Sequence, residues 1–200
     1  MIRFKGDNFL MRFTEVRRLH GFANTLKTGI EHVEAAWHGC YINDNDVTRS
    51  MTKTHIRHAV TADFEELLEI DQASFMRGVA YDAPELSYFM NRGGAETLVL
   101  EEDGKIVAFI ILEVHRTRRS GTIVTLDVRK THRRNGYGTL LLSRAEDILS
   151  DYGVEAYDLQ VDVTNRGAIN FYKKHGLHTV RTLTRYYANG NDAYLMVKEL

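Results

Sequence analysis

The residues whose types and spacing most clearly suggest a binding function form one short turn, Arg133-Arg134-Asn135-Gly136-Tyr137-Gly138-Thr139. A strand-like stretch rich in β-branched residues precedes this turn, and a helical pattern follows it. Unpaired N–H groups at a helix start, together with the helix dipole, form an anion site. Glycine lets the backbone approach a phosphate closely, and arginine adds charge-assisted hydrogen bonds. The turn therefore predicts a pyrophosphate site, with an ordinary glycine-containing turn as the alternative.

Two common phosphate motifs do not fit this turn. The second glycine is not followed by Lys and Ser or Thr, as a P-loop requires. Leu141 stands where the dinucleotide fingerprint needs a third glycine or an alanine. The turn alone therefore leaves open which molecule carries the pyrophosphate.

The elements that must position the turn alternate between strand and helix from Thr54 onward. Asp103-Gly104, between two apolar stretches, indicates a hairpin. The order predicts a mixed α/β fold with an antiparallel start and at least one parallel crossover. The expected strands are 55–61, 98–100, 106–114, 122–128, 156–163, 179–187 and 192–198, and the expected helices cover 64–75, 86–90, 140–149 and 165–176.

The first fifty residues carry a separate signal. Apolar residues from Phe13 to Trp37 recur at spacings of three and four, which predicts an amphipathic helix. The basic residues of this segment are typical of a targeting peptide, but the acidic residues among them argue against one. We therefore expect residues 1–50 to be an N-terminal helical extension, with Met51 as an alternative translation start.

The composition is that of an average globular chain, with 44% hydrophobic and 26% charged residues in a length of 200. A net charge of -1 gives no electrostatic reason to expect nucleic-acid binding. No apolar stretch approaches the roughly 20 residues of a membrane span. The single Cys40 excludes an intramolecular disulfide, and the histidines show no ligand spacing, so we expect no metal. These features predict a soluble cytoplasmic protein without a membrane partner.

Three segments carry a family resemblance, in the same order along the chain. The turn at 133–139 resembles the acetyl-CoA pyrophosphate loop of the GNAT N-acetyltransferase superfamily. Residues 159–177 resemble the second acetyl-CoA segment of that superfamily. Residues 185–196 resemble the C-terminal hairpin of its protein N-terminal branch, which includes the RimI-type and archaeal enzymes. The resemblance covers roughly residues 55–200, and nothing before Met51 takes part.

The resemblance implies the GNAT fold for a domain at 54–200. That fold is α/β, with a mixed and mostly antiparallel central sheet of about six or seven strands flanked by about four helices. In such a domain one strand separates from its neighbour, and the pantetheine arm lies in the gap.

The resemblance also implies acetyl-CoA as the co-substrate. The strand that would bind pantetheine and polarise the thioester contains Leu126, Asp127 and Val128. The pyrophosphate would be held by Arg133, Arg134, Asn135, Gly136, Tyr137, Gly138 and Thr139. Asn165 matches an asparagine that contacts the cofactor, although a helix N-cap explains it equally well.

Tyr172 matches the family's general acid and would also border the cofactor. An ordinary tyrosine has a pKa of about 10, so it is protonated at neutral pH and can give its proton to a departing thiolate. A core aromatic on the helix of Ile169 is the alternative interpretation of this residue.

One position departs from the family pattern. Gln160 stands where the branch often carries Glu or His, and a neutral amide cannot accept the amine's proton. Asp127, acting through a water, is our candidate base, and Glu113 and His115 are further candidates. An α-amine (pKa of about 7.7–8.0) needs a base less than a lysine does (about 10.4), because more of it is neutral near pH 7. Gln160 therefore favours an α-amine acceptor.

The expected activity is direct acetyl transfer to an amine, without a covalent enzyme intermediate. In the N-terminal branch, tyrosines at the positions of Tyr186 and Tyr187 line the peptide groove, and Tyr81 would lie on the opposite wall. The expected partner is the N-terminus of a protein or peptide, such as a ribosomal protein. The alternatives are a lysine or small-molecule amine as acceptor, and a non-catalytic acyl-CoA-binding module.

Overall fold

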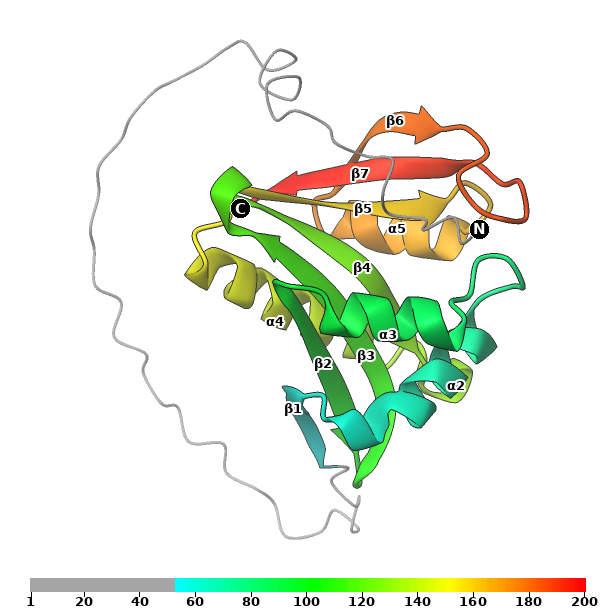
Figure 1. Ribbon diagram of the computed structural model, residues 1–200, viewed down its shortest axis with the longest axis vertical. Coiled ribbons are helices and arrows are strands. Elements are labelled where there is room, and N and C mark those ends of the chain that lie inside the picture. The colour runs from blue at the N-terminus through cyan, green and yellow to red at the C-terminus, as the bar shows by residue number, and fades with distance from the viewer. Residues whose placement is uncertain (1–52) are drawn as a thin grey trace, which may run out of the picture. The chain divides into compact units, whose positions relative to one another are not determined.

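The computed structural model describes residues 53–200, so the helix predicted within 1–50 lies outside the described residues (Figure 1). Seven strands form one sheet, which confirms the mixed α/β expectation. The strands are β1 (Thr54–His58), β2 (Ala95–Glu102), β3 (Lys105–His115), β4 (Ser120–Val128), β5 (Ala156–Asp162), β6 (His178–Leu183) and β7 (Ala193–Glu199). The helices are α2 (Phe64–Ser74), α3 (Ala83–Asn91), α4 (Tyr137–Asp151) and α5 (Arg166–Lys174). No helix in this range is long and apolar enough to cross a membrane.

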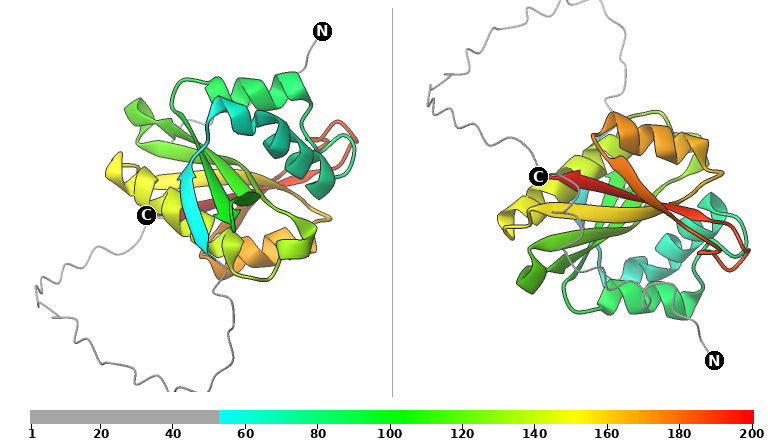
Figure 2. Two further views of the ribbon diagram at one scale, coloured as in Figure 1. Left: turned by 90° about the horizontal axis from the view of Figure 1, so that it is seen from below. Right: turned by 90° about the horizontal axis from the view of Figure 1, so that it is seen from above.

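The sheet order is β1-β2-β3-β4-β5-β7-β6. Only β4 and β5 run parallel, because α4 forms the crossover between them. The remaining neighbours pair antiparallel. Helices α2 and α3 cover one face of the sheet, and α4 and α5 cover the other, so the domain has three layers (Figure 2).

Strand β3, which lies inside the sheet between β2 and β4, shows why both faces are covered. Its sequence is apolar at almost every position, as expected for a strand buried on two sides. Phe109 and Ile111 pack against α2 and α3, whereas Ile110 and Leu112 pack with the apolar face of α4. The apolar clusters on the two faces of the sheet hold β4 beside β3. They thereby position the end of β4 that precedes the glycine turn.

Strands β4 and β5 diverge after a short paired stretch. Ser120–Thr122 pairs with Ala156–Asp158, and no register pair joins the two strands beyond that point. The β3–β4 register also shifts between Ile111 and Leu112, which leaves Val124 as an extra residue in β4. Such a bulge bends its strand and increases the twist. The separated ends of β4 and β5 enclose the site described below.

Two predicted strands are too long. The strand predicted over 55–61 ends at His58, because Asp63 Oδ2 accepts the Val60 N–H at 2.8 Å and starts a 3-10 turn. The strand predicted over 179–187 ends at Leu183. Arg185 has a left-handed φ of 49°, and its N–H donates to Asp192 Oδ1 at 2.7 Å. The predicted groove tyrosines therefore lie in the β6–β7 loop rather than in a strand.

Candidate active site

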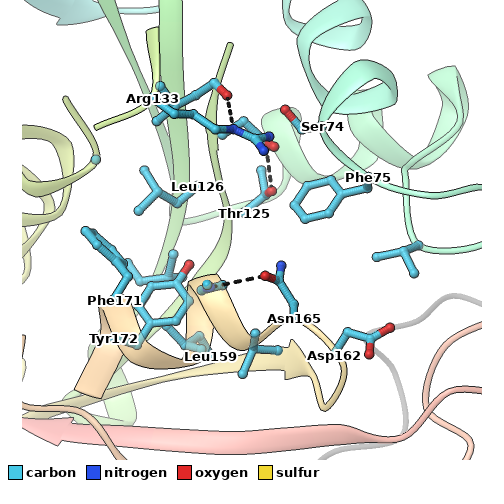
Figure 3. Close-up of a pocket in the computed structure, with 18 of the residues that line it drawn as sticks. Ser74, Phe75, Thr125, Leu126, Arg133, Leu159, Asp162, Asn165, Phe171 and Tyr172 are labelled. Carbon is cyan, nitrogen blue, oxygen red and sulfur yellow. Dashed lines mark hydrogen bonds between the residues drawn. The ribbon is translucent and has the colours of Figure 1, made fainter. Parts of the chain in front are cut away.

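A cavity of about 850 Å³ opens between the diverging strands β4 and β5 (Figure 3). Its wall also includes the turn before α4, the first turns of α5, the α2–α3 loop and the β6–β7 loop. The residues expected at the site that line the cavity are Tyr81, Leu126, Asp127, Val128, Arg133, Arg134, Gly136, Tyr137, Gly138, Thr139, Asn165, Tyr172, Tyr186 and Tyr187. Asn135, which was expected to help hold the pyrophosphate, does not line it.

The glycine turn forms one end of the cavity. Gly136 is the N-cap of α4 and has a φ of 85°, a conformation that glycine adopts without strain. No side chain caps this helix start, and its first residues line the cavity, so the N–H groups of the first turn are available to an anion. Arg133 Nε donates to the Val128 carbonyl at 3.0 Å, which holds the guanidinium beside the end of β4. This donor set fits a pyrophosphate.

The Tyr137 hydroxyl has a structural partner. It donates a short hydrogen bond to Glu102 Oε1, and this bond raises the pKa of Tyr137. His132 Nε2 lies 3.2 Å from the other oxygen of the same carboxylate. Tyr137 therefore presents its backbone to the turn while its side chain ties α4 to β2.

Asn165 is the N-cap of α5. Its Oδ1 accepts the Ala168 N–H at 3.1 Å, as the capping alternative predicted (Figure 3). The cap uses only the oxygen of the amide, and the residue also lines the cavity. The capping and cavity-lining positions are thus compatible in one side chain.

Asp127 is a buried carboxyl in the cavity wall, with an exposed fraction of 1%. Its Oδ2 accepts the Thr125 hydroxyl at 2.7 Å, whereas Oδ1 accepts no hydrogen bond from the described residues. Burial, and then the nearby charge of Asp71, raise the pKa of Asp127 to about 8. Thr125, the Ser74 hydroxyl and the charge of Arg133 oppose this rise without cancelling it.

Tyr172 lies on α5 and also lines the cavity, with an exposed fraction of 8%. Phe171 packs edge-on against its ring at 5.2 Å between centroids (Figure 3). Burial, and then the charge of Asp127, raise the pKa of Tyr172 above its ordinary value. The phenol therefore keeps its proton at neutral pH, which a proton donor requires.

Three tyrosines line the other end of the cavity. Tyr186 OH donates to Gln160 Oε1 at 3.1 Å, and Tyr187 OH donates to the Gln160 carbonyl at 3.3 Å. Tyr81 OH donates to the Val124 carbonyl at 3.4 Å. Burial raises the pKa of all three, that of Tyr186 to about 12.

The two further candidate bases lie away from the cavity. Neither Glu113 nor His115 is among its lining residues. Glu113 Oε1 instead pairs with Arg92 Nε at 2.9 Å, and burial lowers the pKa of His115. Of the three candidate bases, only Asp127 lines the cavity. Within 53–200, no group of three or more His, Cys, Asp or Glu side chains could hold a metal ion.

Several lining residues were not expected at the site from the sequence. Ser74 ends α2 and reaches the cavity from the opposite face of the sheet to α5. Apolar periodicity predicts the helix but carries no signal that its last residue, Ser74, borders a cavity. His132 and Phe171 adjoin recognised motif positions, and their closeness to the motif was the available signal.

Comparison with known proteins agrees with this geometry. The acetyltransferase (GNAT) family profile matches residues 64–177. An N-alpha-acetyltransferase of Sulfurisphaera tokodaii is 31% identical over 160 residues, which are 72% of this chain and 92% of that protein. An N-alpha-acetyltransferase of Sulfolobus acidocaldarius is 30% identical over the same shares of the two chains.

Two solved structures show the same fold. Ard1 from Thermoplasma volcanium superposes with a TM-score of 0.67 at 25% identity, covering 74% of this chain and 97% of that one. The ribosomal-protein-S18-alanine N-acetyltransferase from Escherichia coli superposes with a TM-score of 0.66 at 24% identity, covering 74% and 94%. The chain described here therefore belongs to the acetyltransferase (GNAT) family and is an acetyl-CoA-dependent acyltransferase.

Proposed function

We propose that this protein transfers an acetyl group from acetyl-CoA to the N-terminal α-amine of a protein or peptide. The supporting observation is the contact between the two loops at the tyrosine end of the cavity. A Cβ placed on Gly78 in the α2–α3 loop would lie 3.0 Å from the backbone nitrogen of Asn189 in the β6–β7 loop. Such closely approaching walls admit a chain end more easily than a lysine whose backbone continues in both directions. The relatives named N-alpha-acetyltransferase support the same acceptor.

The chemistry requires the acceptor nitrogen to lose two protons. Acetyl-CoA supplies the acetyl group as a thioester; the N–C bond forms and the C–S bond breaks. The carboxyl group of Asp127, which is buried in the cavity wall, would take the first proton from the α-ammonium. Its pKa of about 8 is close to that of an α-amine, which favours this transfer.

Tyr172 would handle the second proton. Its hydroxyl gives a proton to the departing sulfur and regains one from the nitrogen as the amide forms. The proton on Asp127 then passes to water, so each turnover releases one proton. Glycine-turn N–H groups and Arg133 would hold the pyrophosphate during these steps.

The test is mass spectrometry of peptides incubated with the full chain and acetyl-CoA. The peptides vary the first residue, include ribosomal-protein N-termini, and are matched by N-terminally blocked peptides that carry lysine. We expect acetylation of free α-amines with a preference for particular first residues. Modification of the blocked set alone would assign the activity to lysine instead.

Two variants serve as mechanistic controls. Tyr172→Phe and Asp127→Asn each remove one proton-transfer group, and we expect each to lower kcat by about 10²–10⁴-fold. The Kd for acetyl-CoA, measured by calorimetry, should change little. Unchanged kcat in both variants would remove the assigned roles even if the peptides react. A chain that binds acetyl-CoA without acetylating any amine would be a binding module.

A further inference from the structure

A line of hydrogen-bonded side chains runs from the cavity along the sheet face that α2 and α3 partly cover. It begins at Tyr186, whose hydroxyl donates to Gln160 Oε1. The Gln160 amide nitrogen donates to Asp158 Oδ1 at 3.1 Å. Thr122 Oγ1 donates to the same carboxylate oxygen at 3.4 Å. Gln160 lines the cavity, whereas Asp158 lies behind it.

The carboxylate sets the direction of every bond in this line. An ionised carboxylate only accepts hydrogen bonds, so the Gln160 amide must turn its NH₂ group toward Asp158. The amide oxygen then faces Tyr186, and the tyrosine must donate its O–H to it. The oxygen lone pairs of Tyr186 are what remains to face a ligand.

Tyr81, Tyr186 and Tyr187 form what we call the tyrosine wall of the cavity. In all three, the hydroxyl group is the donor of a hydrogen bond to a protein oxygen. Tyr187 donates to the Gln160 carbonyl and Tyr81 donates to the Val124 carbonyl. All three O–H groups are thereby directed to protein oxygens, while the residues themselves line the cavity. This end of the cavity therefore presents hydrogen-bond acceptors. An ammonium group, which has N–H donors and a positive charge, is the complementary ligand.

On this basis, and resting on the proposed function, we propose that Asp158 is a positioning residue. Acting through the Gln160 amide, it orients the tyrosine wall to accept hydrogen bonds from the α-ammonium of the acceptor peptide. Gln160 thus holds the β6–β7 loop through its hydrogen bonds to Tyr186 and Tyr187. This role explains why the position carries an amide where a base would be expected.

The proposal makes acceptor binding depend on the charge of Asp158. Burial raises its pKa to about 6, the Gln160 and Thr122 hydrogen bonds oppose that rise, and the charge of Glu113 adds to it. The titratable groups facing it are Glu113 and His115 on β3 and Tyr186 in the β6–β7 loop. Arg92, the residue that follows α3, is paired to Glu113. A protonated Asp158 can donate as well as accept, so the amide orientation is no longer imposed.

The test measures acceptor KM and kcat from pH 5 to 8 for the full chain and for Asp158→Asn. In the unmodified chain we expect KM for a free-amine peptide to rise as the pH falls through about 6. In Asp158→Asn we expect KM to be about three- to tenfold higher at pH 7, the effect of one net hydrogen bond, without that acidic rise. Because the substitution removes a buried charge, we expect the variant to fold normally, and its Tm verifies this.

Two further variants distinguish positioning from general damage. Tyr186→Phe removes the hydroxyl group at which the line of hydrogen bonds begins. In that background, Asp158→Asn should raise acceptor KM little further, as expected for coupled residues. Tyr157→Phe disturbs the neighbouring β5 residue, whose hydroxyl bonds Glu146 at 2.6 Å outside the cavity. We expect Tyr157→Phe to leave acceptor KM unchanged. Additive effects of Asp158→Asn and Tyr186→Phe would overturn the proposal.

Peptide binding by calorimetry separates this inference from the proposed function, because it needs no turnover. A free-amine peptide and an analogue with hydrogen in place of the ammonium are titrated against the same variants with CoA present, so that no acetyl group can be transferred. Asp158→Asn should weaken the free-amine peptide and leave the analogue unaffected. Equal weakening of both peptides, or of neither, would refute the inference whether or not any peptide is acetylated.

Discussion

At the scale of single residues, the site contains a carboxyl group in an unfavourable position for stability. Asp127 is almost fully buried, and one of its oxygens has no hydrogen-bond partner among the described residues. A buried unpaired charge costs free energy, and proteins commonly reduce the cost by shifting the pKa. The raised pKa of Asp127 is therefore both a stability cost and the property that suits it to accept a proton near neutral pH.

The pH dependence of unfolding tests this cost. The pKa of Asp127 is 3.8 as its ordinary value and about 8 in the folded protein, so folding favours the protonated form. Its stabilising contribution is complete below pH 4 and is lost as the pH rises to about 8. We expect Asp127→Asn to be more stable than the unmodified chain at pH 8, by on the order of a few kcal/mol, in urea titrations.

Asp158 makes a similar contribution to folding stability, which is lost as the pH rises through its pKa of about 6. Both proteins contain Asp158, so its contribution cancels in the difference between them, and the effect of Asp127 is measured between pH 6 and 8. Parallel stability curves for the two proteins across this interval would show that Asp127 is already ionised at pH 6.

At the scale of elements, the cofactor end depends on how α4 begins. Gly136 adopts a left-handed φ of 85°, and a Cβ there would meet no atom within 4 Å. An alanine at this position is therefore disfavoured by backbone conformation alone, by about 1–2 kcal/mol. Any relaxation of that strain would move the N–H groups of the first turn of α4 away from the pyrophosphate position.

Gly104 offers a matched control for this element. It lies in the β2–β3 hairpin with a φ of 78°, a Cβ added to it would likewise meet no atom within 4 Å, and it does not line the cavity. We expect Gly136→Ala and Gly104→Ala to lower Tm by similar amounts. Only Gly136→Ala should raise the Kd for acetyl-CoA in calorimetry, and an equal change in Kd for both variants would contradict this role for the turn.

At the scale of the whole domain, the sheet consists of two parts, β1 to β4 and β5 to β7. Few backbone pairs join them along one seam, which lies between β4 and β5. Three register pairs connect β4 to β5, whereas β2–β3 and β5–β7 pair along most of their lengths. The apolar core under α4 spans the seam and holds the two parts together. A ligand lying in the gap would add contacts to both parts and stabilise the separated strands.

Ligand-linked stability measures this effect. Acetyl-CoA at a hundred times its Kd should raise the free energy of unfolding by about 2.7 kcal/mol. Hydrogen exchange should slow in residues 123–128 and 159–162, the facing edges of β4 and β5. Adenosine 3′,5′-bisphosphate, which lacks the pantetheine arm, is the control and should protect the turn at 133–139 only. Equal protection by both ligands would place acetyl-CoA outside the gap.

Features that depend on near neighbours along the chain could be predicted from the amino-acid sequence. The alternation of strand and helix, the Asp103-Gly104 hairpin and the strand-to-helix turn at Gly136 all follow from patterns within a few residues, and the structure confirms them. The family order of three motifs indicated the site region, and almost every residue selected there lines one cavity. Strand ends were less accurate, because the side chains of Asp63 and Asp192 divert the backbone.

The chemical properties of each site residue, in contrast, depend on contacts between elements that are distant in the sequence. Gln160 and Tyr186 are 26 residues apart, so their hydrogen bond depends on how the β6–β7 loop folds back onto β5. The raised pKa of Asp127 depends on burial and on Asp71 of α2, which packs across the sheet face. Sequence patterns fix which way a residue faces along its own element. The distances and burial that control proton transfer and hydrogen-bond direction arise from packing between elements.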